Sequence, residues 1–262
     1  MNLKDRGVEV RQVCAERERV DLDRVAAACD ARTRVISVSW VGYATGWRND
    51  LAAFAELAHR KGAKLFVDAI QGLGVFPLYL AEIPIDFLAA DGHKWMLGPE
   101  GAGIFYVRRE HLDWLRPLGV GWNSVAQAGD YSDARLNLKS NAGRYEGGTY
   151  NMVGLAGMAA ALELVKSSSP AERSERLLEV TDEIAERLQQ LGATIHSDRD
   201  PTRKSGILAF TFPQTDPQKI KRKLLEQFVI VNCRQGRLRV SPHVYTNADD
   251  IDRLIAALAQ EI

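Results

Sequence analysis

A chain of 262 residues is long enough to form one large domain or two smaller ones with a sizeable buried core. Lys and Arg together number 34, as do Asp and Glu, so the formal net charge is zero. This balance excludes binding to nucleic acid or to anionic membranes through a strong overall positive charge. Hydrophobic residues make up 46% of the chain and charged residues 26%, which excludes disorder as the state of the whole chain.

The cysteines and the N-terminus indicate the compartment. Cys14, Cys29 and Cys233 form no CxxC pair and are odd in number, a pattern typical of a reducing environment. The first residues lack the apolar core of a signal peptide, and no apolar run reaches the ~18 residues that cross a bilayer. We therefore expect a cytoplasmic globular protein without membrane or nucleic-acid partners.

In chain order, the first half alternates helices and strands. Asn49 or Asp50 can cap the helix that begins near Leu51, and Gly62 stands where a helix ends in a left-handed residue. Strands that are apolar on both faces and separated by helices are typical of a buried parallel sheet. We expect helices over 21–30 and from Leu51, and strands over 34–40, 64–68, 86–91 and 103–107.

The second half has shorter strands and longer amphipathic helices. Asn247, with Asp250 in the first turn, predicts the start of the last helix. This pattern is typical of a small α+β domain of antiparallel strands with helices on one face, here 166–262, after a large domain over 1–165. The expected helices cover 156–165, 176–191, 217–227 and 248–262, and the expected strands cover 193–197, 207–212, 228–232 and 237–240.

Asp68 ends one of the predicted parallel strands. Ligands bind beyond the carboxyl ends of the strands in open α/β sheets, so a carboxylate at this position can act on a ligand. It could be a metal ligand, a general base or the partner of a protonated ring nitrogen. Strand-end aspartates are equally often helix caps, and this residue alone does not decide between these roles.

Lys94 directly follows the next predicted strand, in the segment Ala-Asp-Gly-His-Lys-Trp. Partial desolvation beyond a sheet edge lowers the pKa of an amine toward the range in which it is nucleophilic. The ordinary alternative is an exposed loop lysine. The combination with Asp68 and with the glycine-rich segment 98–103 favours a role in chemistry.

Several blocks carry these residues, namely KLFVDAIQGLG, IDFLAADGHKWMLGPEGAGIFYV, RYEGGTYN and LRVSPHVYTNADDIDRL. They resemble the class V aminotransferases, a cysteine-desulfurase-like family of fold-type I enzymes that use pyridoxal 5'-phosphate (PLP). The resemblance implies an α/β fold of the PLP-dependent transferase (aspartate aminotransferase-like) type, with a mostly parallel central sheet and a smaller C-terminal α+β domain. It also implies a homodimeric enzyme that acts on an amino acid.

The resemblance further implies roles for residues that match the family's motifs. Lys94 would form the Schiff base with PLP and then shuttle the proton at the substrate's α-carbon. Asp68 would pair with the pyridinium nitrogen and keep it protonated, so that the ring acts as an electron sink. Gln71 would hydrogen-bond the phenolic oxygen of the cofactor, and His93 would lie beside its phosphate.

Three more positions follow from the same motifs. Thr149 would reach the phosphate bound by the other subunit, and Arg239 would grip the substrate's α-carboxylate through bidentate hydrogen bonds. Asp91 stands where the family more often has serine. Since a carboxylate would repel the phosphate, we expect Asp91 to turn outward or to bond a backbone amide.

The chain departs from the family pattern at its start and at one turn. It lacks a long N-terminal block before a strand over 7–13, including the helix N-terminus that cradles the phosphate, so the large domain is expected to be incomplete. Cysteine desulfurases need a nucleophilic cysteine on a mobile loop. Here only Gln235-Gly236 separates Arg234 from Arg237, so Cys233 lies next to a tight turn and desulfurase activity is disfavoured.

We therefore predict a PLP-dependent enzyme that performs transamination, epimerisation or β-elimination on an amino acid. The alternative is a non-catalytic partner subunit of the same family that does not retain PLP. His59, His111, His196 and His243 lack paired ligand spacing, so no metal site is predicted.

Overall fold

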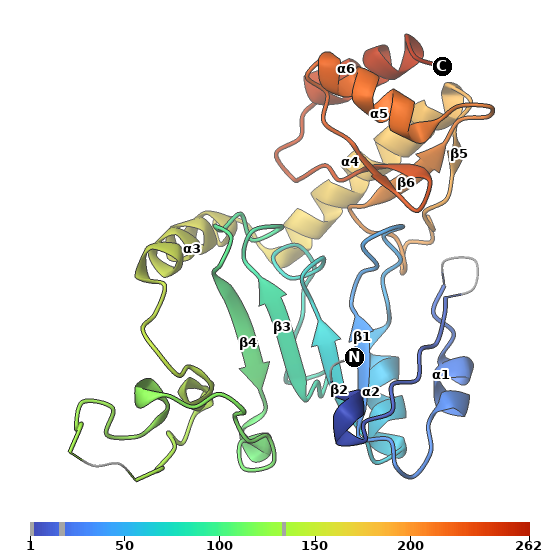
Figure 1. The fold of residues 1–262 in the computed structure, drawn as a ribbon. Coiled ribbons are helices and arrows are strands. Elements are labelled where there is room, and N and C mark those ends of the chain that lie inside the picture. The colour runs from blue at the N-terminus through green and yellow to red at the C-terminus, as the bar shows by residue number, and fades with distance from the viewer. Residues whose placement is uncertain (1–2, 16–18, 133–134) are drawn as a thin grey trace.

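The computed structural model describes residues 3–15, 19–132 and 135–262 (Figure 1). β1, β2 and β3 of its larger sheet run parallel, and β4 runs antiparallel to β3 at the edge. The C-terminal ends of β2 and β3 face the smaller domain, as Figure 1 shows. The expected, mostly parallel sheet is confirmed. Its strands are β1 (Val35–Ser39), β2 (Lys64–Asp68), β3 (Phe87–Asp91) and β4 (Gly103–Val107).

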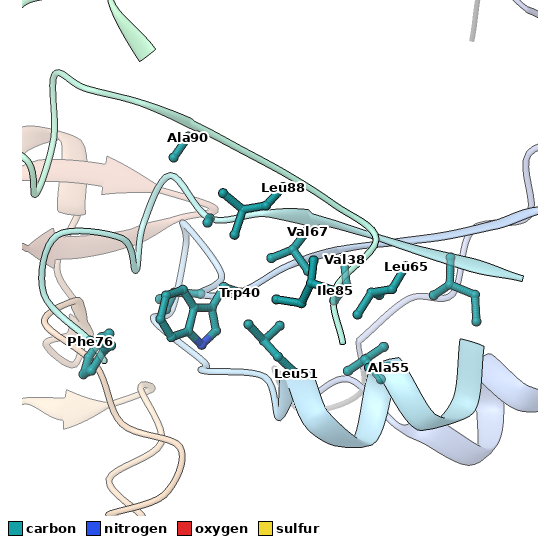
Figure 2. Packing of buried hydrophobic residues seen from close by; sticks show 14 of the residues in the cluster. Val38, Trp40, Leu51, Ala55, Leu65, Val67, Phe76, Ile85, Leu88 and Ala90 are labelled. Carbon is teal, nitrogen blue, oxygen red and sulfur yellow. The ribbon is translucent and has the colours of Figure 1, made fainter. Parts of the chain in front are cut away.

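One face of this sheet is covered by α2 (Leu51–Arg60), which makes the crossover from β1 to β2, and α1 (Leu22–Ala28) contacts α2. Asp50 is the N-cap of α2 and accepts a hydrogen bond from the Ala53 N–H at 3.1 Å. Figure 2 shows the α2 side chains against the buried side chains of the sheet. This apolar layer fixes the strands, and with them the strand ends that carry Asp68 and Lys94.

The smaller domain contains a second sheet in the order β5-β6-β8-β7, and every pair in it is antiparallel. Buried side chains of β6 and β8 form one core with residues of three helices, so all three helices lie on one face of the sheet. The expected α+β domain is confirmed. Its elements are α4 (Pro170–Gln190), β5 (Thr194–Ile195), β6 (Leu208–Thr211), α5 (Pro217–Glu226), β7 (Asn232–Arg234), β8 (Arg237–Val240) and α6 (Ala248–Ala259).

α4 connects the two cores. Its Leu177 packs in the core of the large sheet, whereas Val180 and Ile184 pack in that of the small sheet. The predicted boundary between 165 and 166 stays a prediction, since α4 contributes to both sides. The remaining elements are α3 (Met152–Val165) and the short 3-10 helices η1 (Lys4–Arg6), η2 (Arg109–His111), η3 (Trp122–Ser124) and η4 (Ala142–Tyr145).

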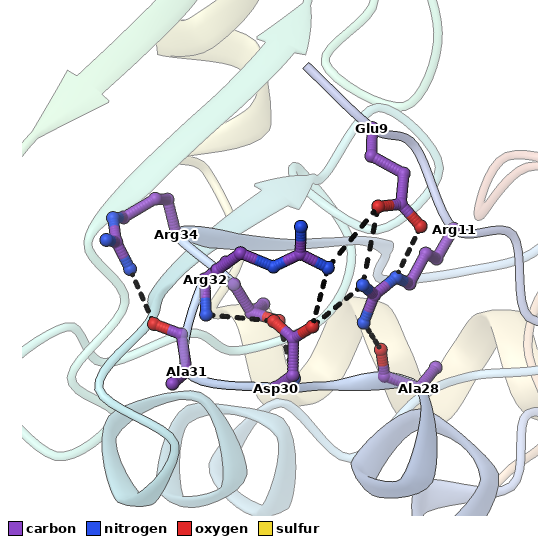
Figure 3. Close-up of polar contacts among 8 residues, drawn as sticks. Glu9, Arg11, Ala28, Asp30, Ala31, Arg32 and Arg34 are labelled. Carbon is purple, nitrogen blue, oxygen red and sulfur yellow. Dashed lines mark hydrogen bonds and ion pairs between the residues drawn. The ribbon is translucent and has the colours of Figure 1, made fainter. Parts of the chain in front are cut away.

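The strand expected over 7–13 is wrong, because among the described residues no strand pairs with this segment. Its backbone is irregular and its valines Val8 and Val10 are exposed. Arg11 holds the segment by bonding the Ala28 carbonyl at 2.9 Å and the Asp30 carboxylate at 2.8 Å (Figure 3). A segment rich in β-branched residues forms a strand only where a neighbouring strand pairs with its backbone N–H and C=O groups.

The strand expected over 228–232 is also wrong over most of its length, since β7 begins only at Asn232. Phe228 has a φ of 59°, a left-handed value that takes its backbone out of the extended conformation. The helix expected to begin at Arg176 begins earlier, at Pro170. Ser169 caps it in a reciprocal capping box with Glu172, a signal that is readable in the sequence.

A buried carboxylate stabilises the end of the large sheet opposite to the end that carries Asp68. Asp86 is 1% exposed and accepts a hydrogen bond from the Leu65 N–H at 2.7 Å. Its carboxylate also contacts His59 Nε2 of α2 at 2.8 Å and His111 Nε2 of η2 at 2.5 Å. One side chain thus joins α2, β2 and η2, which gives these two histidines a structural role.

Candidate active site

Asp68 and Lys94 lie at the C-terminal ends of two adjacent parallel strands. Asp68 is the last residue of β2 and pairs with Ala89 of β3, and Lys94 follows the end of β3 by three residues. The loop that carries Lys94 is closed by a hydrogen bond from the Gly98 N–H to the Gly92 carbonyl at 2.8 Å. The sheet therefore brings the amine and the carboxylate to one edge.

The Lys94 amine has an environment that suits a nucleophile. Burial lowers the pKa of Lys94, Arg239 acts in the same direction, and the carboxylates of Asp68 and Asp91 act in the opposite one. No side chain in the described part of the chain makes a hydrogen bond or an ion pair with this amine. A partly desolvated amine that no partner holds is available to react.

Gln71 is almost fully buried, and the direction of its side-chain amide is set by a neighbour. Its Oε1 accepts a hydrogen bond from the Trp95 indole Nε1 at 3.0 Å. An indole N–H can only donate, so this contact leaves the Gln71 amide nitrogen as the end that can donate to a ligand. Asp68 is likewise oriented, because its Oδ1 accepts from the Ile70 N–H at 3.1 Å.

His93 and Asp91 lie beside Lys94 in the same loop. Asp91 Oδ1 accepts from the Gly92 N–H at 2.9 Å, so the expectation that Asp91 would bond a backbone amide is confirmed. Its second oxygen lies 3.2 Å from His93 Nδ1, without the alignment of a hydrogen bond. His93 Nδ1 is therefore a buried nitrogen that the described residues leave without a hydrogen-bond partner.

Arg239 reaches this site from the smaller domain. Leu238 and Val240 are buried in the core, so the alternation of β8 turns Arg239 to the other face, toward the large domain. Its Nη1 donates to the Tyr43 carbonyl, whereas its Nε is buried and finds no acceptor among the described residues. Burial lowers the pKa of Arg239, and Arg234 acts in the same direction.

Cys233 lies on the face of the small sheet that turns away from Arg239. It pairs with the buried Leu238, whereas Asn232 pairs with Arg239. Gln235 and Gly236 form the turn, with φ values of 50° and 73° that are typical of a two-residue hairpin. The tight turn expected from the sequence is thus confirmed, and it holds the thiol away from Lys94.

Thr149 is not brought together with the other five predicted residues. It is exposed, and no hydrogen bond or ion pair within the described part of the chain joins it to Lys94. Its segment is anchored elsewhere, since the Gly147 carbonyl accepts from the Asn123 N–H at 3.2 Å. An exposed position is compatible with the predicted role toward a second subunit, which stays a prediction.

Sequence reasoning missed Trp95 and His243. The two rings stack with their centroids 5.5 Å apart, and Trp95 is also the hydrogen-bond donor that orients Gln71. A buried tryptophan needs an acceptor for its indole N–H, which is the one sequence signal that pointed to such a contact. No motif or spacing in the sequence indicates that His243 lies beside Trp95.

Residues 3–15, 19–132 and 135–262 contain neither a metal-binding cluster nor a membrane-spanning helix. No three His, Cys, Asp or Glu side chains gather there in a way that could hold a metal ion. None of the helices there combines the length and apolarity needed to cross a bilayer.

Comparisons with known proteins place this geometry in context. The sequence model of the family described as aminotransferase class-V matches residues 1–254. A probable cysteine desulfurase of Methanothermobacter thermautotrophicus is 28% identical, with the alignment covering all of this chain and 69% of the relative. The isopenicillin N epimerase of Streptomyces clavuligerus is 30% identical over 88% of this chain and 61% of the relative. The chain is thus clearly shorter than both of these proteins.

Among solved structures, C-DES, a cystine C-S lyase in complex with its product cysteine persulfide, superposes with a TM-score of 0.85. It is 25% identical, over 93% of this chain and 65% of that one. A C-DES variant with glycine covalently linked to its PLP cofactor gives a TM-score of 0.86 at 25% identity, with the same coverage.

Proposed function

Because this chain belongs to the aminotransferase class-V family and has the fold expected for it, we propose that it is a PLP-dependent enzyme acting on an amino acid. The reaction class we propose is transamination, epimerisation or β-elimination. The observation that carries the proposal is the Lys94 amine, which is partly buried and makes no hydrogen bond or ion pair in the described part of the chain.

The residues around Lys94 fit PLP in their chemistry. Burial leaves His93 Nδ1 and Arg239 Nε without hydrogen-bond partners among the described residues, so the site has unused polar groups. Asp68 would hold a protonated ring nitrogen, and the Gln71 amide nitrogen would donate to the phenolic oxygen. His93 would lie beside the phosphate. Asp68 and Gln71 are oriented by hydrogen bonds that do not involve a ligand.

Bound PLP supplies an electron sink for the negative charge that develops at the α-carbon of an amino acid. The protein's own contribution is placement and proton transfer. Arg239 would hold the substrate carboxylate through its guanidinium fork, which fixes the α-carbon relative to the amine. Lys94, with its lowered pKa, would take the α-proton and return it.

A desulfurase reaction is disfavoured for this chain. Cys233 faces the same way as the buried Leu238, opposite to Arg239, on a hairpin with a two-residue turn. A thiol held there lacks the reach that transfer of sulfur to the protein requires. The reactions that we propose need no protein thiol.

We also propose a homodimer, with Thr149 of each subunit contributing to the partner's site. Support comes from large apolar side chains that are exposed on β4, on α3 and just before α3, because exposed apolar surface often marks a protein–protein contact. They are Ile104, Phe105, Tyr150, Met152, Val153, Leu155 and Leu164.

Cofactor binding by the wild-type chain tests this function. We expect a visible absorbance band after PLP is added, and borohydride reduction should fix one cofactor to the peptide that contains Lys94. Absorbance and the mass of the intact and digested chain are the measurements. A spectrum equal to that of free PLP, with no adduct, would instead favour the non-catalytic partner subunit.

Arg239→Gln tests the carboxylate role. Loss of charge-assisted hydrogen bonds, at ~1.5–3 kcal/mol, should weaken amino-acid binding by about 10- to 100-fold while leaving PLP attached to Lys94. Spectral titration of the PLP-loaded protein with a panel of amino acids measures this. Arg222→Gln on the exposed face of α5 is the matched control and should leave affinity unchanged. Equal affinities in the two variants would contradict the assignment.

A further inference from the structure

Trp95, which directly follows Lys94, is confined on several sides. Its indole Nε1 donates to Gln71 at 3.0 Å, and its side chain is buried. A Cβ atom added to Gly74 would lie 2.8 Å from the Trp95 carbonyl oxygen, and one added to Gly206 would lie 2.6 Å from the Trp95 ring. Trp95, the residue next to Lys94, is therefore closely packed at both its backbone and its ring.

His243 of the smaller domain also contacts Trp95, through its ring and through a hydrogen bond. Its Nε2 lies 3.2 Å from the Trp95 carbonyl oxygen, so this nitrogen must carry the proton that it donates. The two rings stack at an interplanar angle of 27°, and Tyr245 also stacks on His243, with centroids 4.8 Å apart. His243 is 8% exposed, so these contacts form away from water.

The segment that carries His243 also carries Arg239. Only Val240, Ser241 and Pro242 separate them, and β8 pairs with β6 up to Val240. The proline fixes one backbone dihedral in this short link. A short link thus joins Arg239 to His243, and His243 contacts the residue next to Lys94.

We propose that His243 is a positioning residue for Lys94, acting through its hydrogen bond to and stack on Trp95. It keeps the Lys94 amine at the C-terminal ends of the strands. It also connects this position, through a short link, to β8, the strand that carries Arg239. The catalytic meaning of this role rests on the proposed function of Lys94. The positioning itself is a property of the polypeptide that can be measured without PLP.

The test is the pH dependence of Lys94 acylation in the full chain, freed of any bound cofactor. Traces of an amine-acylating reagent are applied across a pH series, and the modified Lys94 peptide is quantified against the exposed Lys61 peptide. In the wild type, Lys94 should react with a lower midpoint than Lys61. In His243→Leu we expect this midpoint to rise by about half a unit or more, because a loosened loop hydrates the amine.

His196→Leu is the control, because His196 is a second histidine of the smaller domain, itself partly buried, and contacts Thr211 Oγ1 at 2.9 Å. It should leave the Lys94 midpoint unchanged. If His243→Leu does not fold, His243→Phe keeps a flat ring in the stack without the N–H donor and is judged by the same criterion.

A His243 variant with the wild-type Lys94 midpoint would overturn the proposal, even if its melting temperature fell below that of the wild type. The outcome is separable from that of the cofactor experiment. Failure of PLP to attach to the wild type refutes the proposed function, whereas an unchanged acylation midpoint refutes only the positioning role.

Discussion

Lys94→Ala is expected to abolish covalent attachment of PLP to the chain. Only an amine can form the reducible bond to the cofactor's aldehyde, and burial, with Arg239 acting in the same direction and Asp68 in the opposite one, lowers the pKa of Lys94. Intact-mass measurement after PLP addition and borohydride reduction should show one adduct on the wild type and none on the variant. The visible absorbance band should be lost with it.

The same substitution should leave the fold intact. The Lys94 amine makes no hydrogen bond or ion pair with the described residues, so its removal leaves no buried partner unsatisfied. We expect the free energy of unfolding to change by less than about 0.5 kcal/mol, or to increase.

Lys61→Ala, in the exposed C-cap of α2, is the matched control and should retain the adduct at Lys94. An adduct of wild-type yield on Lys94→Ala would place the reactive amine elsewhere and remove the central residue of the proposed site.

The strands and the residues at their ends could be predicted because the information is local. β2 and β4 have the bounds expected from their apolar runs, and Asp68 and Lys94 lie at one edge as the parallel arrangement requires. Arg239 was placed by family resemblance alone. The hydrophobic periodicity of the sequence does not show that Arg239 on β8, in the smaller domain, will lower the pKa of the Lys94 amine.

Apart from the start of α4, whose capping box is readable in the sequence, the errors depended on long-range contacts that the local sequence does not specify. The segment 7–13 is rich in valine, yet among the described residues it lacks a neighbouring strand. The stretch 228–232 alternates buried and exposed apolar residues like a strand, yet Phe228 takes a left-handed backbone. The stack of Trp95 on His243 was missed for the same reason.

Asp86→Ala is expected to destabilise the chain by about 3–5 kcal/mol, the range for breaking a buried pair by removing one partner. The carboxylate is 1% exposed and is shared by the Leu65 N–H, His59 and His111. Its removal leaves the buried donors without an acceptor and loosens α2 and η2 from β2. Urea unfolding of the wild type and the variant at neutral pH measures the difference.

The control for this effect is Asp113→Ala, which removes a carboxylate of 99% side-chain exposure just after η2. Its long contact with Arg144 is worth at most about 1 kcal/mol, as for exposed ion pairs in general. If Asp86→Ala were no less stable than Asp113→Ala, the hydrogen bonds of Asp86 would not be what holds α2 and η2 against β2.

The effect of Asp86 should also depend on pH in a direction that the structure fixes. Burial alone would raise the pKa of Asp86, but the Leu65 N–H and the two histidines outweigh it and hold this pKa below its ordinary value. A carboxylate with a lowered folded-state pKa stabilises the fold above its unfolded pKa, near ~4, and loses this contribution as the pH falls through the folded value. The stability gap between wild type and Asp86→Ala should therefore be complete at pH ~7 and shrink below pH ~4. A gap that stayed constant into acid would mean that packing around the side chain, rather than its charge, fastens α2 and η2 to β2.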